Sequence, residues 1–164
     1  TPVREEVISE VCAAVSEMSR LRIGALIAFE RSAGLRHYIE TGTTLNAQVS
    51  RELLLTIFYD KNPLHDGAVI IRNQVIAAAR CILPVSTSLK LSPHLGLRHR
   101  AAVGLTEQTD AFVVVVSEES GTSSVAQQGE LISNLTAAEL RTYLQEALVA
   151  RPAIDEETAK DLPS

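Results

Sequence analysis

Residues 63–83 read PLHDGAVIIRNQVIAAARCIL, and the rest of the chain is organised around this stretch. Two short apolar runs rich in β-branched residues, 68–71 and 75–79, are separated by the polar residues 72–74. Short apolar runs on either side of a polar turn are typical of a β-hairpin whose strands are buried. The stretch therefore predicts a hairpin in the core of a sheet.

Asp66 lies directly before the first strand of this hairpin, between His65 and Gly67. A carboxylate held at the edge of a rigid sheet is well placed to act as a base or as a metal ligand. The glycine lets a ligand approach the backbone closely. Asp-Gly is also a common turn dipeptide, so these residues alone leave a plain turn open.

The composition is that of a folded domain. The chain has 164 residues, of which 46% are hydrophobic and 21% charged, and this length fits one domain. No apolar run approaches the roughly 18 residues that a membrane span needs. The net charge of −5 argues against binding to a nucleic acid polymer, which would favour a basic surface. Cys12 and Cys81 have no metal-ligand spacing, and we expect both to be reduced core residues.

Helical and strand patterns alternate along the chain. We expect helices over residues 3–20, from an N-cap at Asn46 to residue 61, over 98–110, and from Thr136, which forms a capping box with Glu139. We expect a central strand over 22–30, the hairpin, a Val-rich strand over 111–117 and its partner over 122–127. We expect loops over 31–44 and 84–96, with 37–39 as a candidate edge strand and His94 as a surface residue.

These elements predict a single α/β domain with a mixed central sheet flanked by helices. The domain is expected to span residues 1–150, and the acidic tail over 151–164 is expected to be disordered. Because the first residue is Thr1 and no signal peptide is visible, we expect the chain to be an excised or processed segment.

A second group of polar residues lies at the start of the predicted helix over 98–110. Arg98, His99 and Arg100 occupy its first turn, where the helix dipole makes a cation unfavourable by about 0.3–1 kcal/mol. A bound phosphate would remove this penalty by accepting hydrogen bonds from the backbone N–H groups and the guanidinium groups. A solvated basic helix start, with the arginine stems covering apolar surface, is the alternative.

A third group follows the Val-rich strand. If the strand continues, Ser117 and Glu119 share one face, so a hydroxyl and a carboxylate converge on one ligand. Together the three groups favour a site for a nucleoside triphosphate or similar phosphoester with a divalent metal. The chain has no glycine-rich loop of the Walker or dinucleotide-binding type.

The motifs PLHDGAVII, LGLRHRAAVGL and VVVSEESG followed by GEL closely resemble the catalytic domain of bacterial diadenylate cyclases, whose signatures are DGA and RHR. The likeness runs from about Val7 to near Val149. The opening EEVISEVCAAVSEMSRLRIGALIAFER looks most like the subgroup whose catalytic domain follows an N-terminal membrane anchor. That likeness implies a full-length protein at the cytoplasmic face of the plasma membrane, and a regulatory protein is a candidate partner.

The resemblance implies that two ATP molecules are converted into cyclic di-AMP and two pyrophosphates, with Mg²⁺ or Mn²⁺ as the metal. Asp66 would activate the ribose 3′-hydroxyl close to the metal, which His65 and Glu119 would help to coordinate. The remaining residues would contact ATP: Gly67 and Ala68 beside the nucleotide, Arg98, His99, Arg100 and Ser117 at the phosphates, and Ile82 and Leu83 at the adenine.

The product has two equivalent phosphodiester bonds, whereas the chain has one copy of each motif. We therefore expect a two-fold, head-to-head homodimer with facing active sites, held weakly and stabilised by metal and ligand. Two residues depart from the family pattern. Leu97 replaces a hydroxyl residue, and Ile82 replaces a tyrosine whose stacking on the base would contribute ~1–3 kcal/mol. These departures motivate the alternative of a nucleotide sensor without turnover. A third hypothesis is a nucleotidyltransferase that transfers the nucleotide to another acceptor.

Overall fold

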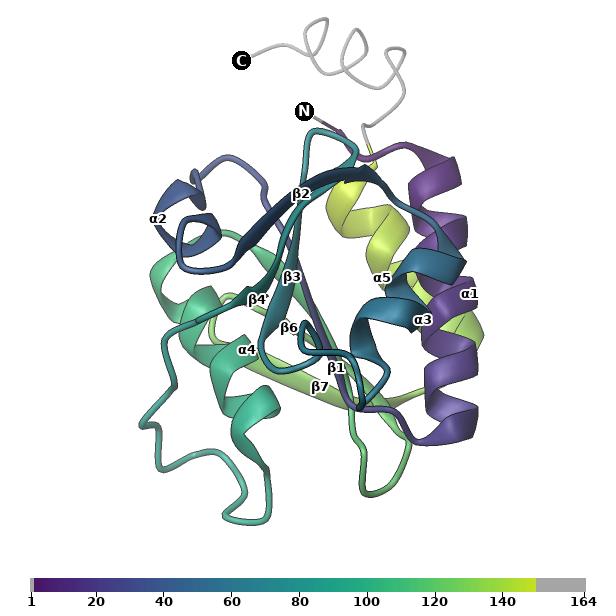
Figure 1. Ribbon diagram of the computed structural model, residues 1–164. Coiled ribbons are helices and arrows are strands. Elements are labelled where there is room, and N and C mark those ends of the chain that lie inside the picture. Colours follow the sequence, from purple (N-terminus) through teal and green to yellow (C-terminus); the bar gives the residue numbers. More distant parts are fainter. Residues whose placement is uncertain (1, 150–164) are drawn as a thin grey trace, which may run out of the picture.

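The computed structural model describes residues 2–149, and within this range seven strands form one mixed sheet with helices on both faces (Figure 1). The strands are β1 (Ala25–Phe29), β2 (Thr43–Gln48), β3 (Ala68–Arg72), β4 (Val75–Cys81), β5 (Phe112–Val116), β6 (Ser123–Gln127) and β7 (Glu130–Leu135). Their spatial order is β2-β4-β3-β1-β5-β6-β7. β1 and β3 are parallel, and the other neighbouring pairs are antiparallel. The predicted α/β fold with a mixed central sheet is confirmed.

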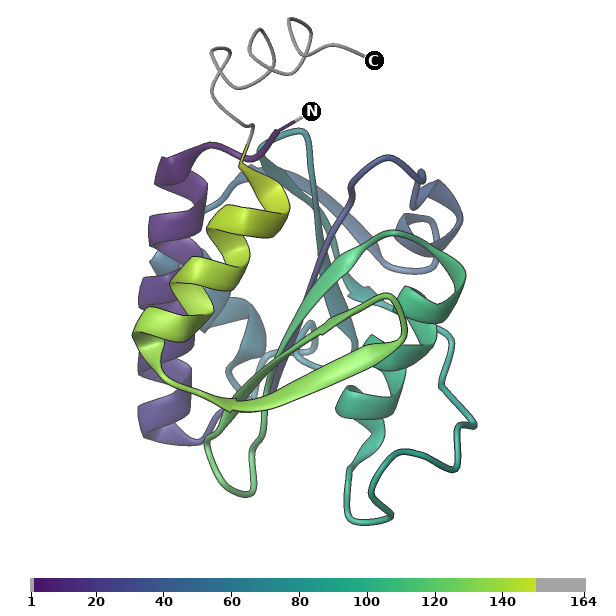
Figure 2. The same ribbon diagram turned by 180° about the vertical axis from the view of Figure 1, so that it is seen from behind.

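The helices in the same range form two layers. They are α1 (Glu5–Leu21), α2 (Arg36–Ile39), α3 (Arg51–Phe58), α4 (Leu97–Gln108) and α5 (Ala137–Leu148). Figures 1 and 2 show α1, α3 and α5 over one face of the sheet and α2 and α4 over the other. The sheet therefore has a separate hydrophobic core on each face.

The central strands are apolar throughout because both of their faces are covered. In β5, Phe112, Val114 and Val116 belong to the core beneath α1, α3 and α5, whereas Val113 and Val115 belong to the core beneath α4. All five residues of β1 are buried, and β1 lies between β3 and β5. The predictions of a central strand over 22–30 and of a strand over 111–117 are confirmed.

The predicted hairpin over residues 68–79 is also confirmed. β3 and β4 pair in antiparallel fashion through a turn at Asn73 and Gln74, whose φ angles are 50° and 69°. Two consecutive positive φ values are characteristic of the turn that matches the twist of paired strands. Both strands are mostly buried, so the hairpin lies inside the sheet and carries the residues before β3 and after β4 to one edge.

Local hydrogen bonds define two of the helix starts. The capping box predicted for α5 is present, with the Thr136 hydroxyl accepting from the N–H of Glu139 at 3.1 Å. The predicted N-cap of α3 is wrong, because Ser50 caps that helix through the N–H of Leu53 at 3.0 Å. Asn46 instead lies within β2 at a bulge, with a φ of 49°.

Three elements at the periphery differ from the sequence prediction or were not predicted. Residues 37–39 belong to the one-turn helix α2, in which the carbonyl of Leu35 accepts the N–H groups of Tyr38 and Ile39. The edge strand β2 spans the end of the predicted loop over 31–44 and the predicted helix start at Asn46, and the other edge strand, β7, was not predicted. Both strands are largely solvent-exposed, so they lack the apolar runs that mark the central strands.

The acidic tail predicted for residues 151–164 lies outside the described residues, so its disorder stays a prediction. Across residues 2–149, no helix has both the length and the apolar character required to span a bilayer.

Candidate functional site

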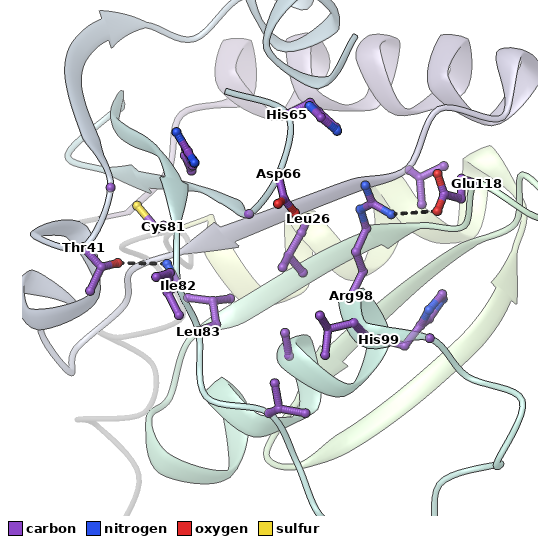
Figure 3. Close-up of a pocket in the computed structure, with 18 of the residues that line it drawn as sticks. Leu26, Thr41, His65, Asp66, Cys81, Ile82, Leu83, Arg98, His99 and Glu118 are labelled. Carbon is purple, nitrogen blue, oxygen red and sulfur yellow. Dashed lines mark hydrogen bonds and ion pairs between the residues drawn. The ribbon is translucent and has the colours of Figure 1, made fainter. Parts of the chain in front are cut away.

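A cavity of about 890 Å³ lies at the edge of the sheet that is formed by the ends of its central strands, not by an edge strand. Its volume is in the range of small-molecule sites. The topology explains its position. β1 and β3 are parallel and begin at this edge, whereas β4 and β5 run antiparallel to them and end there. The N-terminus of α4 and the residues before β2 complete the wall (Figure 3). Segments distant in the sequence therefore meet at one place.

Asp66 is held at the cavity by the close approach of Gly67 to the end of β4. Gly67 has a φ of 125°, and a Cβ there would lie 2.8 Å from the carbonyl carbon of Arg80 and 2.9 Å from the oxygen of Cys81. Any other residue would be strained and would push the two strands apart. Asp66 and Gly67 are thus part of the cavity wall, and the backbone conformation at Gly67 fixes the position from which the Asp66 side chain extends.

His65 is tied to the preceding turn. Its Nδ1 lies 2.8 Å from the carbonyl oxygen of Asn62. A carbonyl only accepts hydrogen bonds, so Nδ1 carries a proton, and in the neutral ring Nε2 then has the lone pair. The imidazole is therefore in the tautomer that is able to ligate a metal or accept a proton through Nε2.

The start of α4 presents an open set of hydrogen-bond donors. Its N-cap is Gly96, which offers no side-chain cap, and helix geometry leaves the first N–H groups without helical acceptors. Arg98 extends from this turn into the cavity, where its Nη1 lies 3.4 Å from Oε1 of Glu118 (Figure 3). These donors and the positive end of the helix dipole together favour an anion.

His99 and Arg100 play different parts in the same turn. His99 is only 9% exposed. Burial lowers the pKa of its imidazole, the neighbouring Arg98 lowers it further, and Glu119 opposes the shift, so the ring is uncharged at neutral pH. Arg100 donates to the carbonyls of Leu95 at 3.3 Å and of Ser92 at 3.1 Å. It fixes the loop before α4 and does not line the cavity, which differs from the predicted phosphate contact.

The exit of β5 is a turn, not a continuation of the strand. β5 ends at Val116, and the Ser117 hydroxyl accepts the N–H groups of Glu119 at 3.2 Å and of Ser120 at 3.3 Å. The expectation that Ser117 and Glu119 share a strand face is therefore wrong. Both residues still line the cavity, together with Glu118, because the turn itself forms part of the wall.

The opposite wall is the segment after β4. The N–H of Ile82 donates to the Thr41 hydroxyl at 2.8 Å, which joins this wall to the loop before β2 (Figure 3). Ile82 is 69% exposed and Leu83 is buried, and both line the cavity. Behind them, burial raises the pKa of the Cys81 thiol to about 11. This wall presents apolar side chains to the cavity, and the Cys81 thiol lies buried behind them.

The structure brings most of the predicted site residues together. The cavity is lined by His65, Asp66, Gly67, Ile82, Leu83, Arg98, His99, Ser117 and Glu119. Ala68 is fully buried in the core beneath α4, and it is absent from the lining, as is Arg100. Sequence reasoning missed Glu118 and the segment 41–43, which also line the cavity. Only the small residues around Gly42 signalled a close approach, and a Cβ there would overlap the carbonyl of Ala79.

The cavity offers carboxylates but no complete set of metal ligands. Within residues 2–149, no three side chains of His, Cys, Asp or Glu lie close enough to hold a metal ion by themselves. Mg²⁺ bound with a nucleotide needs only one or two carboxylates, because phosphate oxygens and water supply the other ligands. Two carboxylates, those of Asp66 and Glu119, line the same cavity.

Comparison with known proteins gives a family match. Residues 12–131 match the family model described as DisA bacterial checkpoint controller nucleotide-binding, or DAC. The chain is 51% identical over 148 residues to the cyclic di-AMP synthase CdaA of Bacillus subtilis strain 168, which covers 88% of this chain and 54% of that protein. It is 50% identical over 132 residues to a diadenylate cyclase of Listeria monocytogenes strain 10403S, covering 80% of this chain and 48% of that protein. The chain thus spans about half the length of these relatives.

Solved structures agree with these matches. The crystal structure of DacA from Staphylococcus aureus, a double cysteine mutant, aligns with a TM-score of 0.86 and 48% identity over 87% of this chain and 95% of that chain. A hypothetical membrane spanning protein from Bacillus cereus aligns with a TM-score of 0.78 and 45% identity over 82% of this chain and 65% of that chain.

Proposed function

We propose, since this chain belongs to the DisA bacterial checkpoint controller nucleotide-binding (DAC) family, that it is the catalytic part of a diadenylate cyclase. This membership confirms the family that the DGA and RHR motifs predict. The reaction joins two ATP molecules into cyclic di-AMP and releases two pyrophosphates. The observation that carries the proposal is that Asp66 and Arg98 extend from separate elements into one cavity of nucleotide size (Figure 3).

The start of α4 binds the phosphates in this proposal. Its free N–H groups and the Arg98 guanidinium all donate hydrogen bonds, and phosphate oxygens only accept them. The uncharged, largely buried His99 lines the cavity beside this turn and adds no cation that would need its own partner. Arg100 acts from the other side by holding the loop before the helix.

Asp66 removes the proton from the attacking ribose. Its carboxylate takes the proton of one ATP's 3′-hydroxyl as the oxygen bonds to the α-phosphorus of the other ATP. The bond from that phosphorus to the β-phosphate bridging oxygen then breaks, and pyrophosphate leaves. Hydrogen bonds from donors already in place stabilise the charge that develops on the phosphoryl oxygens. A divalent metal held by Asp66 and Glu119, with His65 nearby, would neutralise part of the phosphate charge when bound.

Cyclisation requires two copies of the site, because the cavity has one Asp66 and one set of phosphate donors. We propose a two-fold homodimer in which the cavities face each other and each ATP attacks its neighbour. The rim of the cavity supports this arrangement. Leu97 is 70% exposed there, and a second copy would cover this apolar side chain.

The adenine fits against the apolar wall after β4. Leu83 is buried and Ile82 is exposed at the cavity, so the base would pack on aliphatic surface. Aliphatic packing lacks the ring stacking that contributes ~1–3 kcal/mol per base on an aromatic side chain. We therefore expect ATP binding that is weaker than a tyrosine at this wall would give, with the reacting groups unchanged.

A direct assay tests the proposal. The chain is incubated with ATP and Mg²⁺ or Mn²⁺, and the products are identified by liquid chromatography and mass spectrometry. Cyclic di-AMP and pyrophosphate are expected. ATP binding without any product, in either metal, would favour the sensor alternative, and a different adenylylated product would identify another acceptor.

A matched pair of variants tests the role of Asp66. Asp66→Asn should bind ATP but form no product, because an amide cannot take the 3′-hydroxyl proton. Asp60→Asn is the control, since Asp60 is exposed and lies outside the cavity. Near-normal turnover of Asp66→Asn would refute the assignment.

We also propose that the complete protein is membrane-associated through a segment outside this chain. The chain spans about half of its curated relatives, and one structural relative is described as membrane spanning. Fractionation of cells that express the complete protein tests this, with recovery in the supernatant as the contradicting result.

A further inference from the structure

Gly24, the residue directly before β1, lies against the guanidinium group of Arg98. A Cβ at position 24 would lie 2.6 Å from Cζ, 2.6 Å from Nη1 and 3.0 Å from Nε of Arg98. These three nearest atoms all belong to the guanidinium end of one side chain. The guanidinium therefore occupies the space that a side chain at position 24 would fill.

The other contact of this guanidinium is weaker in kind. Glu118 pairs with Arg98 at 3.4 Å, but the Glu118 side chain is 65% exposed whereas that of Arg98 is 25% exposed (Figure 3). Solvent and salt screen such a pair, and triphosphate oxygens would compete for the same donors. The room that Gly24 leaves is a property of the backbone, so it is neither screened by salt nor taken up by a ligand. Gly24 thus permits this guanidinium position whether or not a nucleotide is bound.

We infer that Gly24 is a positioning residue, which acts on the nucleotide by leaving room for Arg98 at the phosphate side of the cavity. This inference rests on the proposed function, because it gives Arg98 a phosphate to bind. It adds a residue outside the DGA and RHR motifs and outside the cavity lining. The sequence does not reveal this role, because Gly24 and Arg98 are far apart in the chain and only the fold brings them together.

An alanine at position 24 should displace the guanidinium without unfolding the protein. Favourable contacts between heavy atoms lie near 3.5–4.0 Å, so the group must move by about 1 Å from its place 2.6 Å from the new methyl. The atoms that must move belong to the end of a flexible side chain. Gly24 is also not among the residues with positive φ, so alanine fits its backbone conformation. A misplacement of about 1 Å is able to lower catalysis by up to ~10²-fold.

The test is a double-mutant cycle on binding. The probe is α,β-methylene-ATP with Mg²⁺, whose methylene bridge prevents release of the leaving group, and affinity is measured by calorimetry. Gly24→Ala should weaken binding roughly tenfold when Arg98 is present, because charge-assisted hydrogen bonds depend on geometry. The same substitution should have no effect in the Arg98→Ala background, since coupled residues are non-additive. Gly34→Ala is the matched control, because no atom lies within 4 Å of a Cβ at Gly34.

Each outcome decides the inference. Unchanged binding by Gly24→Ala would overturn it, as would an equal loss in both backgrounds, which indicates a general structural effect. A loss in Glu118→Gln with none in Gly24→Ala would assign the placement to the ion pair instead. If the unmodified chain does not bind the analogue, the inference fails together with the proposed function. If it binds the analogue but makes no cyclic di-AMP, the proposed function fails and the cycle still decides the role of Gly24.

Discussion

Gly104 lies in the middle of α4. The backbone of Pro84 and Ser86, in the segment after β4, crosses the helix there at close range. A Cβ at Gly104 would overlap the carbonyl oxygen of Pro84 and would lie 2.7 Å from its carbonyl carbon and 2.8 Å from the nitrogen of Ser86. The N–H of Ser86 also donates to the carbonyl of Arg100 at 2.9 Å. We predict that Gly104→Ala separates this segment from the helix.

Two opposing effects set the magnitude. In a helix interior, alanine is favoured over glycine by about 0.8–1.0 kcal/mol. Forcing extra volume into a packed site typically costs about 1–3 kcal/mol, and losing the Ser86 hydrogen bond costs about 0.5–1.5 kcal/mol more. The obstructing atoms are backbone, so they cannot rotate away as a side chain would. The steric effect should win, with a net destabilisation of about 1–3 kcal/mol.

Urea denaturation measures this change as a lower midpoint at an unchanged slope. ATP turnover should fall as well, because the displaced segment adjoins Leu83 and contains Val85. Both of these residues line the cavity. Gly34→Ala serves as the control and should leave stability unchanged or raise it by about 0.4–1 kcal/mol. A Gly104→Ala protein about 1 kcal/mol more stable than the unmodified chain would show helix propensity winning and would refute the close approach.

Three further predictions concern the cap, the buried histidine and the thiol. Thr136→Ala removes the capping box of α5 and should lower the free energy of unfolding by about 1 kcal/mol, whereas Thr142→Ala, on an exposed position of the same helix, should be nearly neutral by the same urea assay. The pKa of His99 in the folded protein lies below its ordinary value of 6.5, so just below pH 6.5 the unfolded chain binds more protons than the folded protein does. The free energy of unfolding should therefore fall as the pH drops from 6.5 through the folded pKa. His99→Gln should flatten this slope in urea denaturation series between pH 5 and 7. Cys81 should resist iodoacetamide at neutral pH in the folded protein and react in urea, as followed by mass spectrometry, since its thiol is buried with a pKa of about 11; rapid labelling without urea would contradict the packing of the wall.

The sequence predicts the elements whose signals are local. The hairpin at residues 68–79 is marked by two apolar runs and a polar turn, and α5 by Thr136 with Glu139 three residues later. Edge elements lack such signals. β2 and β7 form only through pairing with β4 and β6, and their exposed residues resemble those of a loop. Their existence depends on neighbours that a sequence pattern does not show.

The site follows the same division. Charged residues in unusual places, such as Asp66 before a strand and Arg98 at a helix start, are visible in the sequence and line one cavity in the structure. Arg100 has the same signal, but its guanidinium is occupied by two backbone carbonyls. Residues that act through close approach, such as Gly24, carry no chemical signal. Only the fold shows which segment they lie against.

Backbone conformation at this edge of the sheet explains how one cavity is built from so many chain segments. Gly67, with a φ of 125°, packs on Arg80, whose own φ is 57°, so the start of β3 and the end of β4 are fixed against each other. On the far side, Arg22 ends α1 with a φ of 55° and donates to the carbonyl of Glu119 at 3.3 Å. Gly121, with a φ of 76°, closes the same turn. Left-handed conformations of non-glycine residues persist only where surrounding contacts hold them. The carboxylates of the proposed site therefore begin from backbone that contacts within the chain hold in place, which is the kind of positioning that in-line attack between two bound ATP molecules requires.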